Sequence, residues 1–522
     1  MAALGYGAKV KAGQGIGLAC NSVWRAPLPT AATIGTYNQS VLSITNTGAP
    51  NVVKAYAPPQ GCKALPILDG SAILPNESFT SAGGGSPNVF FTPTEYFYGG
   101  SFGYEIFVWE TGAASDNPTG QYLSRQMSVS AVNSTACSYY IPGLSWGGTL
   151  PSSAPIYIHT CDDSDPATNG YAYEVSEQIP LSMSSPGSTI SNIEVRKTGS
   201  NTGMLNLQGN CGAYNINGVI ARDGGKHNAL APSGTTVKNS EFINGYYNIA
   251  GIGDSFLVFH DSSTLGCGSL PIFVEDSVFQ QDQVIAGAGA SGNTSIISHT
   301  NDSSSMGTVS LNNDWFIAKN GTILGGIGFA NVTGVVGSRL YGSQLANAIN
   351  MLGNVKLTKS QFVSNVPSNY QIIFQTSKVS LTATDLSICG SNIAQGLLRV
   401  NGATGLRFDL QNSKLYVASP NTNNTSAIFN ISSGQKFHLS GVDFGSAVSN
   451  WAPMEDYGTD DKFTGNNNTY ESSGDPTWYF NGKHYTSLVA WQSAVSPADS
   501  SATEGGGKAV AACTLPNIPV VN

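Results

Sequence analysis

A six-residue phrase repeats through the middle of this chain and constrains the fold more than any other feature. It reads aliphatic residue, any residue, turn residue, small residue, outward residue and large apolar residue, and VKNSEF at 237–242 is its clearest copy. The first position is apolar in all copies but one, and the last is apolar throughout. The ten copies span 190–195, 215–220, 237–242, 274–279, 311–316, 335–340, 357–362, 381–386, 410–415 and 439–444.

The third position of the phrase predicts a bend in the backbone. Eight of its ten residues are Asn, Asp or Gly, which tolerate a left-handed conformation better than other residues do. In chain order they are Asn192, Asn217, Asn239, Asp276, Asn313, Gly337, Lys359, Ala383, Asn412 and Gly441. Because inward and outward residues alternate on either side of this position, each copy is predicted to form two short strands joined by a one-residue bend.

The spacing of the copies predicts the architecture. Their last positions are 22 to 37 residues apart, and a parallel β-helix coil needs about two dozen residues, with additions placed in loops on one side. Each coil buries its apolar columns only against its neighbours, so a continuous core forms by stacking. We therefore predict an all-β fold, a right-handed parallel β-helix of about ten coils.

Composition and turn signals predict five segments. Asn481-Gly482 between aromatic runs indicates a hairpin, and 486–495 is the best helical candidate, so this region is expected to cover the open end of the coils. For residues 29–150 a separate β-domain and irregular opening coils both fit, and we favour the separate domain. The segments are 1–28, an extended arm; 29–150, an N-terminal β-rich domain; 151–447, the β-helix; 448–495, a C-terminal cap; and 496–522, an extended or mobile tail.

The charge content argues against several partners. Only 11% of the residues are charged and the net charge is −9; without a basic stripe, we expect no binding to nucleic acid. No apolar run of 18 residues exists, so we expect no membrane insertion. Residues 1–15 lack the apolar stretch of a cleavable signal, which is expected of a mature chain or of a virion component.

Cysteines and aspartates give no clear metal motif. The eight cysteines are scattered without a Cys-x-x-Cys pair, so neither a zinc site nor a disulfide pairing is inferable. The run CDDSDP at 161–166 holds three aspartates, which could bind calcium through oxygen ligands. A polar turn capped by proline is the alternative.

The strongest local candidate for chemistry is RDGGKHN at 222–228. A Gly-Gly turn here presents Arg222, Asp223, Lys226 and His227 together. Glycan lyases need a base and a charge-neutralising cation, and glycan hydrolases need two carboxylates. The alternative is a solvated turn whose polar side chains bond the backbone.

Two histidines end apolar strands in the two longest coils. His260 is followed by Asp261, and His299 by Asp302 three residues later. The histidines are 39 residues apart, so they are expected in adjacent coils at the root of loops that form one wall of a groove; a simple strand end is the alternative. The aromatic candidates for sugar contact are Trp315, Tyr246 and Tyr247.

The repeat and the cap together resemble the pectate-lyase-type right-handed parallel β-helix superfamily, in the branch with phage tailspikes and polysaccharide-active proteins. The resemblance covers 151–495 and is carried by NSEF at 239–242, DGGKHN at 223–228, NGKHY at 481–485 and AWQ at 490–492. It implies a fold and a glycan partner. Neither the aspartate–arginine cluster of calcium-dependent pectate lyases nor the paired aspartates of polygalacturonase-like hydrolases can be matched, so enzyme activity stays open.

These observations predict a virion tailspike or host-attachment protein that binds, and in an enzymatic form depolymerises, cell-surface polysaccharide. We expect a homotrimer whose N-terminal region contacts other virion proteins. The rivals are a free extracellular polysaccharide lyase or hydrolase and a non-enzymatic structural fibre. No cofactor is required, and calcium stays open.

Overall fold

The computed structural model is nearly all β-strand and divides into two compact units. Unit 1 comprises Met1–Pro232, Ser240–His260 and Val284–Gly292, and unit 2 comprises Ser233–Asn239, Asp261–Gln283 and Asn293–Asn522. The structure describes residues 10–25, 27–32, 40–46, 48–56, 61–97, 106–112, 120–144, 151–199, 203–208, 213–224, 227–232, 234–245, 254–260, 272–281, 294–299, 309–318, 325–329, 332–336, 339–342, 349–351, 355–364, 372–374, 380–393, 396–400, 404–420, 426–431, 434–447, 451–472 and 476–506.

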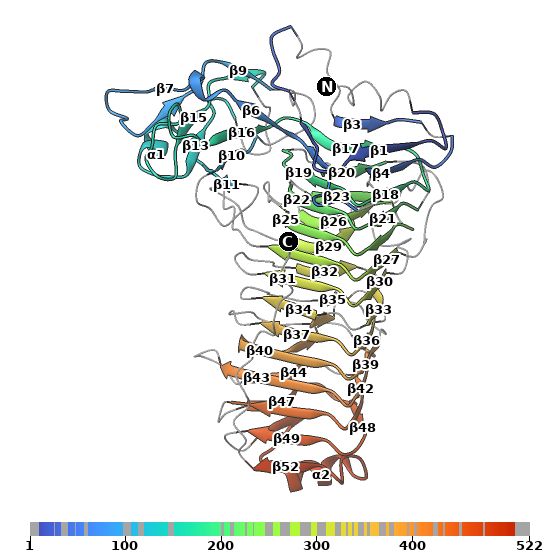
Figure 1. The fold of residues 1–522 in the computed structure, drawn as a ribbon. Coiled ribbons are helices and arrows are strands. Elements are labelled where there is room, and N and C mark those ends of the chain that lie inside the picture. The colour runs from blue at the N-terminus through green and yellow to red at the C-terminus, as the bar shows by residue number, and fades with distance from the viewer. Residues whose placement is uncertain are drawn as a thin grey trace. The chain divides into compact units, whose positions relative to one another are not determined.

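Unit 1 contains three parallel sheets, A, B and C, which the strands enter in rotation (Figure 1). Sheet A holds β1 (Gly15–Ala19), β4 (Val52–Tyr56), β18 (Thr189–Ser191) and β21 (Asn215–Asn217). Sheet B holds β2 (Val23–Arg25), β5 (Ile67–Asp69), β19 (Glu194–Arg196), β22 (Ile220–Gly224) and β25 (Glu241–Gly245). Sheet C holds β3 (Ser40–Ile44), β17 (Ile179–Met183), β20 (Leu205–Leu207), β23 (His227–Pro232) and β26 (Asp254–His260).

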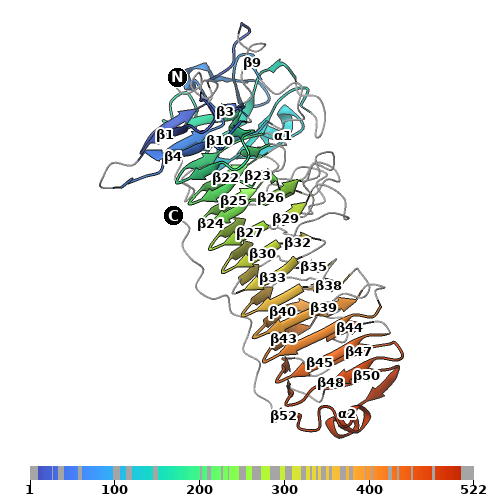
Figure 2. The same cartoon turned by 90° about the vertical axis from the view of Figure 1, so that its right-hand side faces the viewer.

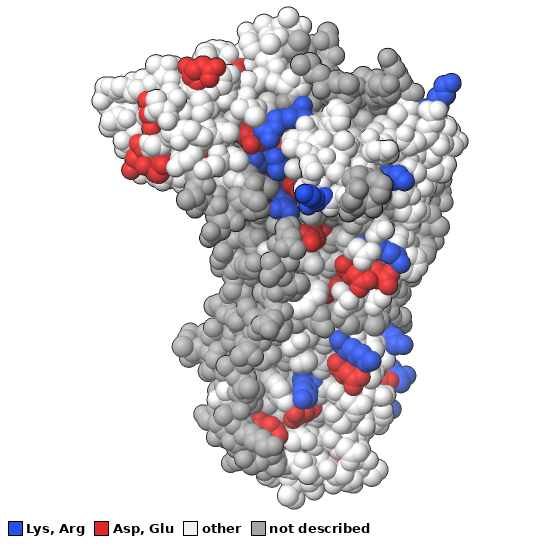
Figure 3. Space-filling view, in the orientation of Figure 1, with Lys and Arg blue, Asp and Glu red and all other residues white. Residues whose placement is uncertain are grey.

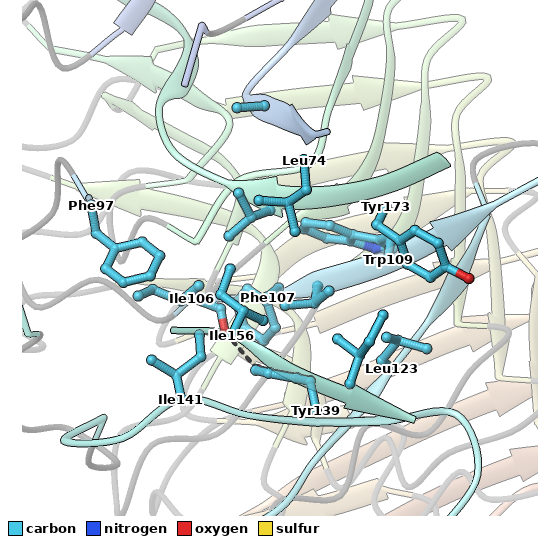
Figure 4. Packing of buried hydrophobic residues seen from close by; sticks show 14 of the residues in the cluster. Leu74, Phe97, Ile106, Phe107, Trp109, Leu123, Tyr139, Ile141, Ile156 and Tyr173 are labelled. Atoms are coloured by element: carbon cyan, nitrogen blue, oxygen red, sulfur yellow. Dashed lines mark hydrogen bonds between the residues drawn. The ribbon is translucent and has the colours of Figure 1, made fainter. Parts of the chain in front are cut away.

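An antiparallel β-domain interrupts the second coil of unit 1, between β5 and β17. In Figure 4, Ile106, Phe107, Tyr139 and Ile156 point toward one another in its core, where the Tyr139 hydroxyl donates to the Ile106 carbonyl. Its elements are β6 (Ser71–Leu74), β7 (Thr80–Ser81), β8 (Phe90–Phe91), β9 (Glu95–Tyr96), β10 (Val108–Thr111), β11 (Gln121–Tyr122), β12 (Ser124–Arg125), α1 (Val129–Asn133), β13 (Ser138–Tyr140), β14 (Ser153–Ala154), β15 (Tyr157–His159) and β16 (Ala172–Ser176), with a 3₁₀ turn at Asn76–Ser78.

The N-terminal segments therefore differ from the expected arm and separate domain. Within the segment 1–28, β1 and β2 pair in parallel with β4 and β5. The reason is visible in retrospect: Leu18 is buried, and Asn21 takes the same left-handed bend (φ 59°) as the later coils. Of the range 29–150, the first part forms opening coils, and the β-domain inserted after β5 extends past residue 150 to the end of β16.

Unit 2 repeats the three-sheet rotation, and its strands stack in order in Figures 1 and 2. Sheet A holds β24 (Thr236–Lys238), β27 (Ile272–Glu275), β30 (Val309–Asn312), β33 (Val332–Val336), β36 (Val355–Thr358), β39 (Ser380–Thr384), β42 (Arg407–Gln411), β45 (Lys436–Ser440) and β48 (Lys462–Thr464). Sheet B holds β28 (Val278–Gln281), β31 (Trp315–Ala318), β34 (Arg339–Gly342), β37 (Gln361–Ser364), β40 (Ser387–Ile393), β43 (Lys414–Pro420), β46 (Asp443–Ser446), β49 (Thr469–Ser472) and β52 (Thr503–Gly506). Sheet C holds β29 (Thr294–His299), β32 (Gly325–Phe329), β35 (Ile349–Met351), β38 (Ile372–Phe374), β41 (Leu398–Val400), β44 (Ser426–Ile431), β47 (Trp451–Asp456), β50 (Trp478–Phe480) and β51 (Lys483–Tyr485).

The predicted bend residues occupy the corner between sheets A and B. Asn239, Asn313 and Asn412 have φ values of 47°, 56° and 49°, which confirms their left-handed conformation. In unit 2 two corner residues of adjacent coils are also hydrogen-bonded, since Asn313 Nδ2 donates to Asp276 Oδ1 at 2.7 Å. Gly337 lies outside the described residues.

Two copies of the phrase were placed in the wrong frame. The bend falls at Gly218 (φ 64°) rather than Asn217, and at Asp385 (φ 56°) rather than Ala383. In the first case the buried pair that flanks the bend is Ile216 and Ala221, one residue later than predicted. In the second it is Ala383 and Ile388, two residues later. The error has one physical cause: small alanines fill core positions where the phrase demands a large residue.

The end of unit 2 is closed by the predicted hairpin and helix (Figure 2). β50 and β51 pair antiparallel around Asn481-Gly482, and α2 (Leu488–Val495) begins after Ser487, whose hydroxyl accepts a bond from the Ala490 amide. The Trp491 ring of α2 stacks on Trp478 with centroids 5.8 Å apart.

The chain beyond α2 also belongs to this closure, in contrast to the extended or mobile tail expected from residue 496. Asp499 is fully buried and accepts bonds from Trp491 Nε1, the Tyr470 hydroxyl and Asn468 Nδ2. β52 then pairs in parallel with β49. Residues 507–522 lie outside the described part of the chain.

Disulfides, which the sequence could not assign, are present in unit 1. Cys20 pairs with Cys62 in the opening coils, and Cys137 pairs with Cys161 in the inserted domain. In unit 2, Cys389 is buried and is also disulfide-bonded. Among the described residues, no helix has the length and apolar character needed to cross a membrane.

Candidate functional site

Charged side chains gather on sheet B of unit 1 and on the loops and strands beside it. Figure 3 shows blue and red atoms close together in the region where Figure 1 places β19 and β22. The chain has 55 acidic and basic residues (23 + 32), so a group of nine in one place is a strong concentration. This charged face consists of Arg25, Asp69, Glu174, Glu194, Arg196, Lys197, Arg222, Asp223 and Glu241.

One part of the charged face joins the inserted domain to the coils. Lys197 Nζ lies 2.8 Å from Glu174 Oε2, and Arg25 reaches both Glu174 (3.1 Å) and Asp69 (2.9 Å). Arg196 Nε donates to the same Asp69 carboxylate at 2.7 Å. Burial opposes ionisation of Glu174, but the charges of Lys197 and Arg25 outweigh it and lower its pKa. These groups are mutually paired, so we assign them a structural role.

A second part of the charged face, in which Arg222 is buried, has a different arrangement. Glu194, Ile220 and Glu241 are direct partners on the neighbouring strands β19, β22 and β25. Arg222 stands two residues after Ile220 and therefore on the same side of the sheet. Its Nε lies 3.5 Å from Glu194 Oε1. We call Glu194, Arg222 and Glu241 the Glu–Arg–Glu triad.

Both carboxyls of the triad hold protons more strongly than an ordinary glutamate. Burial raises the pKa of Glu194, although Arg222 and Arg196 oppose the shift. Burial also raises the pKa of Glu241, again against Arg222 and with the help of the Glu194 charge. Among the described residues Glu241 Oε2 has no hydrogen-bond partner. The triad thus offers two proton-exchanging carboxyls around one guanidinium, which is the equipment of general acid–base chemistry.

The predicted turn at 222–228 contributes two residues to this region. Arg222 belongs to the triad, and Asp223, buried with φ 61°, accepts a bond from Asn244 Nδ2 at 3.2 Å. Its charge also helps to raise the pKa of Glu194, after burial. His227 is buried at the start of β23, in sheet C rather than sheet B. Lys226 lies outside the described residues.

The other candidates lie on separate strands or outside the described residues. His260 ends β26 in unit 1 and pairs with Pro232, while His299 ends β29 in unit 2. Trp315 begins β31 and is half-buried against the Val363–Cys389 cluster, which favours a packing role over an open sugar platform. The candidates Asp261, Asp302, Tyr246 and Tyr247 lie outside the described residues.

Sequence reasoning placed Glu194 and Glu241 on the solvent side of their strands but did not connect them. The signal that could have connected them is their shared position in the repeat, which places them in one column across neighbouring strands. Both occupy the fifth position of the phrase, two coils apart, and Arg196 and Arg222 follow in the next outward column. The frame error at 215–220 hid this alignment, because it put Val219 instead of Ile220 between the two glutamates.

The aspartate run at 161–166 forms a locally bonded turn. Asp162 accepts bonds from the Ser164 amide and hydroxyl, and Asp165 accepts the Ala167 amide. Asp163 Oδ1 lies 2.6 Å from His159 Nε2. Within the described residues no group of three or more His, Cys, Asp or Glu side chains is placed to hold a metal ion.

Comparison with known proteins gives only distant likeness. No family model and no curated protein matches the chain. Among solved structures, XylC in complex with xylose is similar with a TM-score of 0.38, at 10% identity over 88% of this chain and 80% of its own. The catalytic unit of a thermostable GH87 α-1,3-glucanase from Streptomyces thermodiastaticus strain HF3-3 is similar with a TM-score of 0.24, at 12% identity over 80% of this chain and 86% of its own. Both scores lie below 0.5, so the two structures establish no activity for this chain, and neither is described as a pectate lyase or a tailspike.

Proposed function

We propose that this chain is a host-attachment protein that binds a polysaccharide and hydrolyses it at the Glu–Arg–Glu triad. The single observation that carries the proposal is the placement of Glu194 and Glu241 on one column, with Arg222 beside them and both pKa values raised. We further propose that the coils form one right-handed β-helix, on whose outer face the glycan chain would lie.

The geometry supports hydrolysis with inversion. Two strand spacings of about 4.8 Å separate the backbones of Glu194 and Glu241 by roughly 10 Å. Inverting glycoside hydrolases place their two carboxyls about 6.5–9.5 Å apart, which leaves room for the attacking water. The Glu194 side chain approaches β22, the strand between the two glutamates, since its Oε1 lies 3.5 Å from Arg222 Nε.

The proposed step balances with these groups alone. The protonated carboxyl gives its proton to the leaving glycosidic oxygen as the carbon–oxygen bond breaks. The ionised carboxyl takes a proton from a water molecule, whose oxygen forms the new bond to the anomeric carbon. Arg222 opposes the effect of burial on the pKa of both carboxyls and would stabilise whichever of them is ionised.

The attachment role rests on other features. Disulfides persist mainly in extracellular settings, and the described part of the chain carries five disulfide-bonded cysteines: Cys20, Cys62, Cys137, Cys161 and Cys389. The closed end of the coils leaves no open strand edge there. The low content of charged residues (11%) suits contact with a glycan. Labelling intact particles with an antibody against the chain, followed by electron microscopy, tests the virion location.

The chemistry is tested with Glu194→Gln and Glu241→Gln, each compared with Glu77→Gln, a change at an exposed glutamate of the inserted domain. On a panel of neutral and uronate-containing polysaccharides, we expect each triad variant to release reducing ends at least about 100-fold more slowly, as loss of a general acid or base does. Both should still bind the glycan. If both cleave like the Glu77 variant, the triad is not the site; an unsaturated product absorbing in the ultraviolet would indicate a lyase instead.

A further inference from the structure

A second column of polar and aromatic residues lies on sheet C in the last coils of unit 2. The register pairs Arg399 with Asn430, Asn430 with Glu455, Glu455 with Tyr479, and Tyr479 with His484. We call these five residues the sheet-C column. It lies on the face opposite Leu398, Phe429, Met454 and Trp478, which are buried. Within the column Glu455 is itself buried (7% exposed), Arg399, Asn430 and Tyr479 are half-buried, and His484 is exposed.

Aromatic rings form the end of this column. The Tyr479 and His484 rings stack with centroids 4.4 Å apart and planes 15° apart. Tyr457, just after β47, lies 5.6 Å from Tyr479 and is 65% exposed. Large exposed aromatic faces are costly in water, whereas the apolar C–H face of a sugar ring covers them while the phenolic hydroxyls stay wet.

Groups that both donate and accept hydrogen bonds stand next to the rings. Asn430 Nδ2 donates to Glu455 Oε2 at 3.4 Å, a long bond that leaves the amide capacity for another partner. Burial raises the pKa of Glu455 to about 7, against the Asn430 bond that lowers it. A carboxyl that is partly protonated near neutral pH can donate as well as accept, as an amide does. Sugar hydroxyls have the same dual character.

We propose that Tyr457 and the sheet-C column form a saccharide-binding surface for neutral sugars, with rings stacking on Tyr457 and Tyr479 and hydroxyls bonding Asn430 and Glu455. The surface goes beyond the proposed function, because all of its residues belong to unit 2 and none belongs to the Glu–Arg–Glu triad. Neutral sugars fit better than anionic ones, since Arg399 is the one permanent cation of the column. A protein partner would need a broader apolar face than these rings supply.

The test uses the full chain with Tyr457→Ala, Tyr457→Phe and a matched control, Tyr56→Ala. Tyr56 is a comparably exposed tyrosine (70%) on β4 in unit 1. The probes are neutral oligosaccharides of glucose, galactose, mannose and xylose, with binding measured by titration calorimetry and by the shifts of sugar protons in NMR spectra. We expect Tyr457→Ala to weaken binding of the preferred probe at least tenfold, about 1.4 kcal/mol. Tyr457→Phe, which keeps the ring face, and the Tyr56 variant should bind as the parent does.

Two results would overturn the proposal: no saturable binding of any neutral probe to the parent chain, or equal affinity of the Tyr457→Ala and Tyr56→Ala variants. Unchanged thermal unfolding of Tyr457→Ala excludes misfolding as the reason for a loss. The saccharide-binding surface and the Glu–Arg–Glu triad can be tested independently of each other. A Glu194→Gln, Glu241→Gln double variant should keep neutral-sugar binding, and failure of the triad to cleave any polysaccharide leaves this measurement intact.

Discussion

Single residues at the corner between sheets A and B fix where each coil turns. Most are Asn or Asp with positive φ, but Lys359 takes the same conformation with φ 51°. A left-handed backbone conformation is unfavourable for lysine, so the packing of the strands on either side must impose it. The neighbouring residues show how: Ser360 is buried, and Phe362 is fully buried beneath sheet B.

Phe362→Ala should therefore destabilise the chain by roughly 3–5 kcal/mol, because it leaves a cavity inside the stack. The adjacent Gln361 is only half-buried, and Gln361→Ala should change the free energy of unfolding by no more than about 0.5 kcal/mol. Chemical denaturation of both variants checks the contrast. Equal losses would mean that these two side chains do not face opposite sides of β37.

At the scale of strands and caps, repeats and turn residues carry most of the predictable information. Among the described bends, the phrase located those that large apolar residues flank, and Asn481-Gly482 located the closing hairpin. The phrase misplaced the bend in the two copies where Ala221 and Ala383 occupy core positions. The triad was not predictable from the sequence. Glu194 and Glu241 are 47 positions apart (241 − 194), and they share a column only in the correct register of the strand between them. A one-residue error in that register places different residues side by side.

The last hairpin is also held by a pair of carboxyl groups. Asp456 accepts bonds from the Gly458 and Asn481 amides, and Asp461 accepts one from the Gln435 amide. Burial, and then the charge of the neighbouring Asp456, raises the pKa of Asp461 to about 7. The folded cap therefore keeps a proton that the unfolded chain releases.

We predict that the stability of this cap falls as the pH rises from the ordinary aspartate range, about 4, through the raised pKa of Asp461. The sign follows from linkage: in this window the folded state binds more protons than the unfolded state, so each increment of pH favours unfolding. Thermal unfolding at pH 5 and pH 8 measures the slope. Asp461→Asn should flatten it, and an unchanged slope in that variant would show that another group is responsible.

For the whole molecule, weak surface charge favours association between copies. With only 11% charged residues, copies of this chain repel one another weakly, and several copies would raise the avidity of weak sugar contacts. We predict a parallel homotrimer.

Light scattering should then give a mass near 163 kDa, three times 54.3 kDa. The measurement is best made across micromolar concentrations, since a trimer held by extended faces should not dissociate in that range. A constant mass of 54.3 kDa would contradict the prediction. A monomer would also lack the several copies that an avidity effect requires.

The β-domain inserted into the second coil has a consequence for how the chain is made. Ser40 of β3 pairs with Ile179 of β17, so sheet C of the opening coils is completed only by a strand 139 residues later (179 − 40). At about 5–20 residues per second, a ribosome needs on the order of ten seconds to supply it. During that time β3 presents a free strand edge to every other nascent chain, and the contact order of unit 1 is high for the same reason. The yield of folded protein should thus depend on how quickly the inserted domain folds out of the way and lets β17 return.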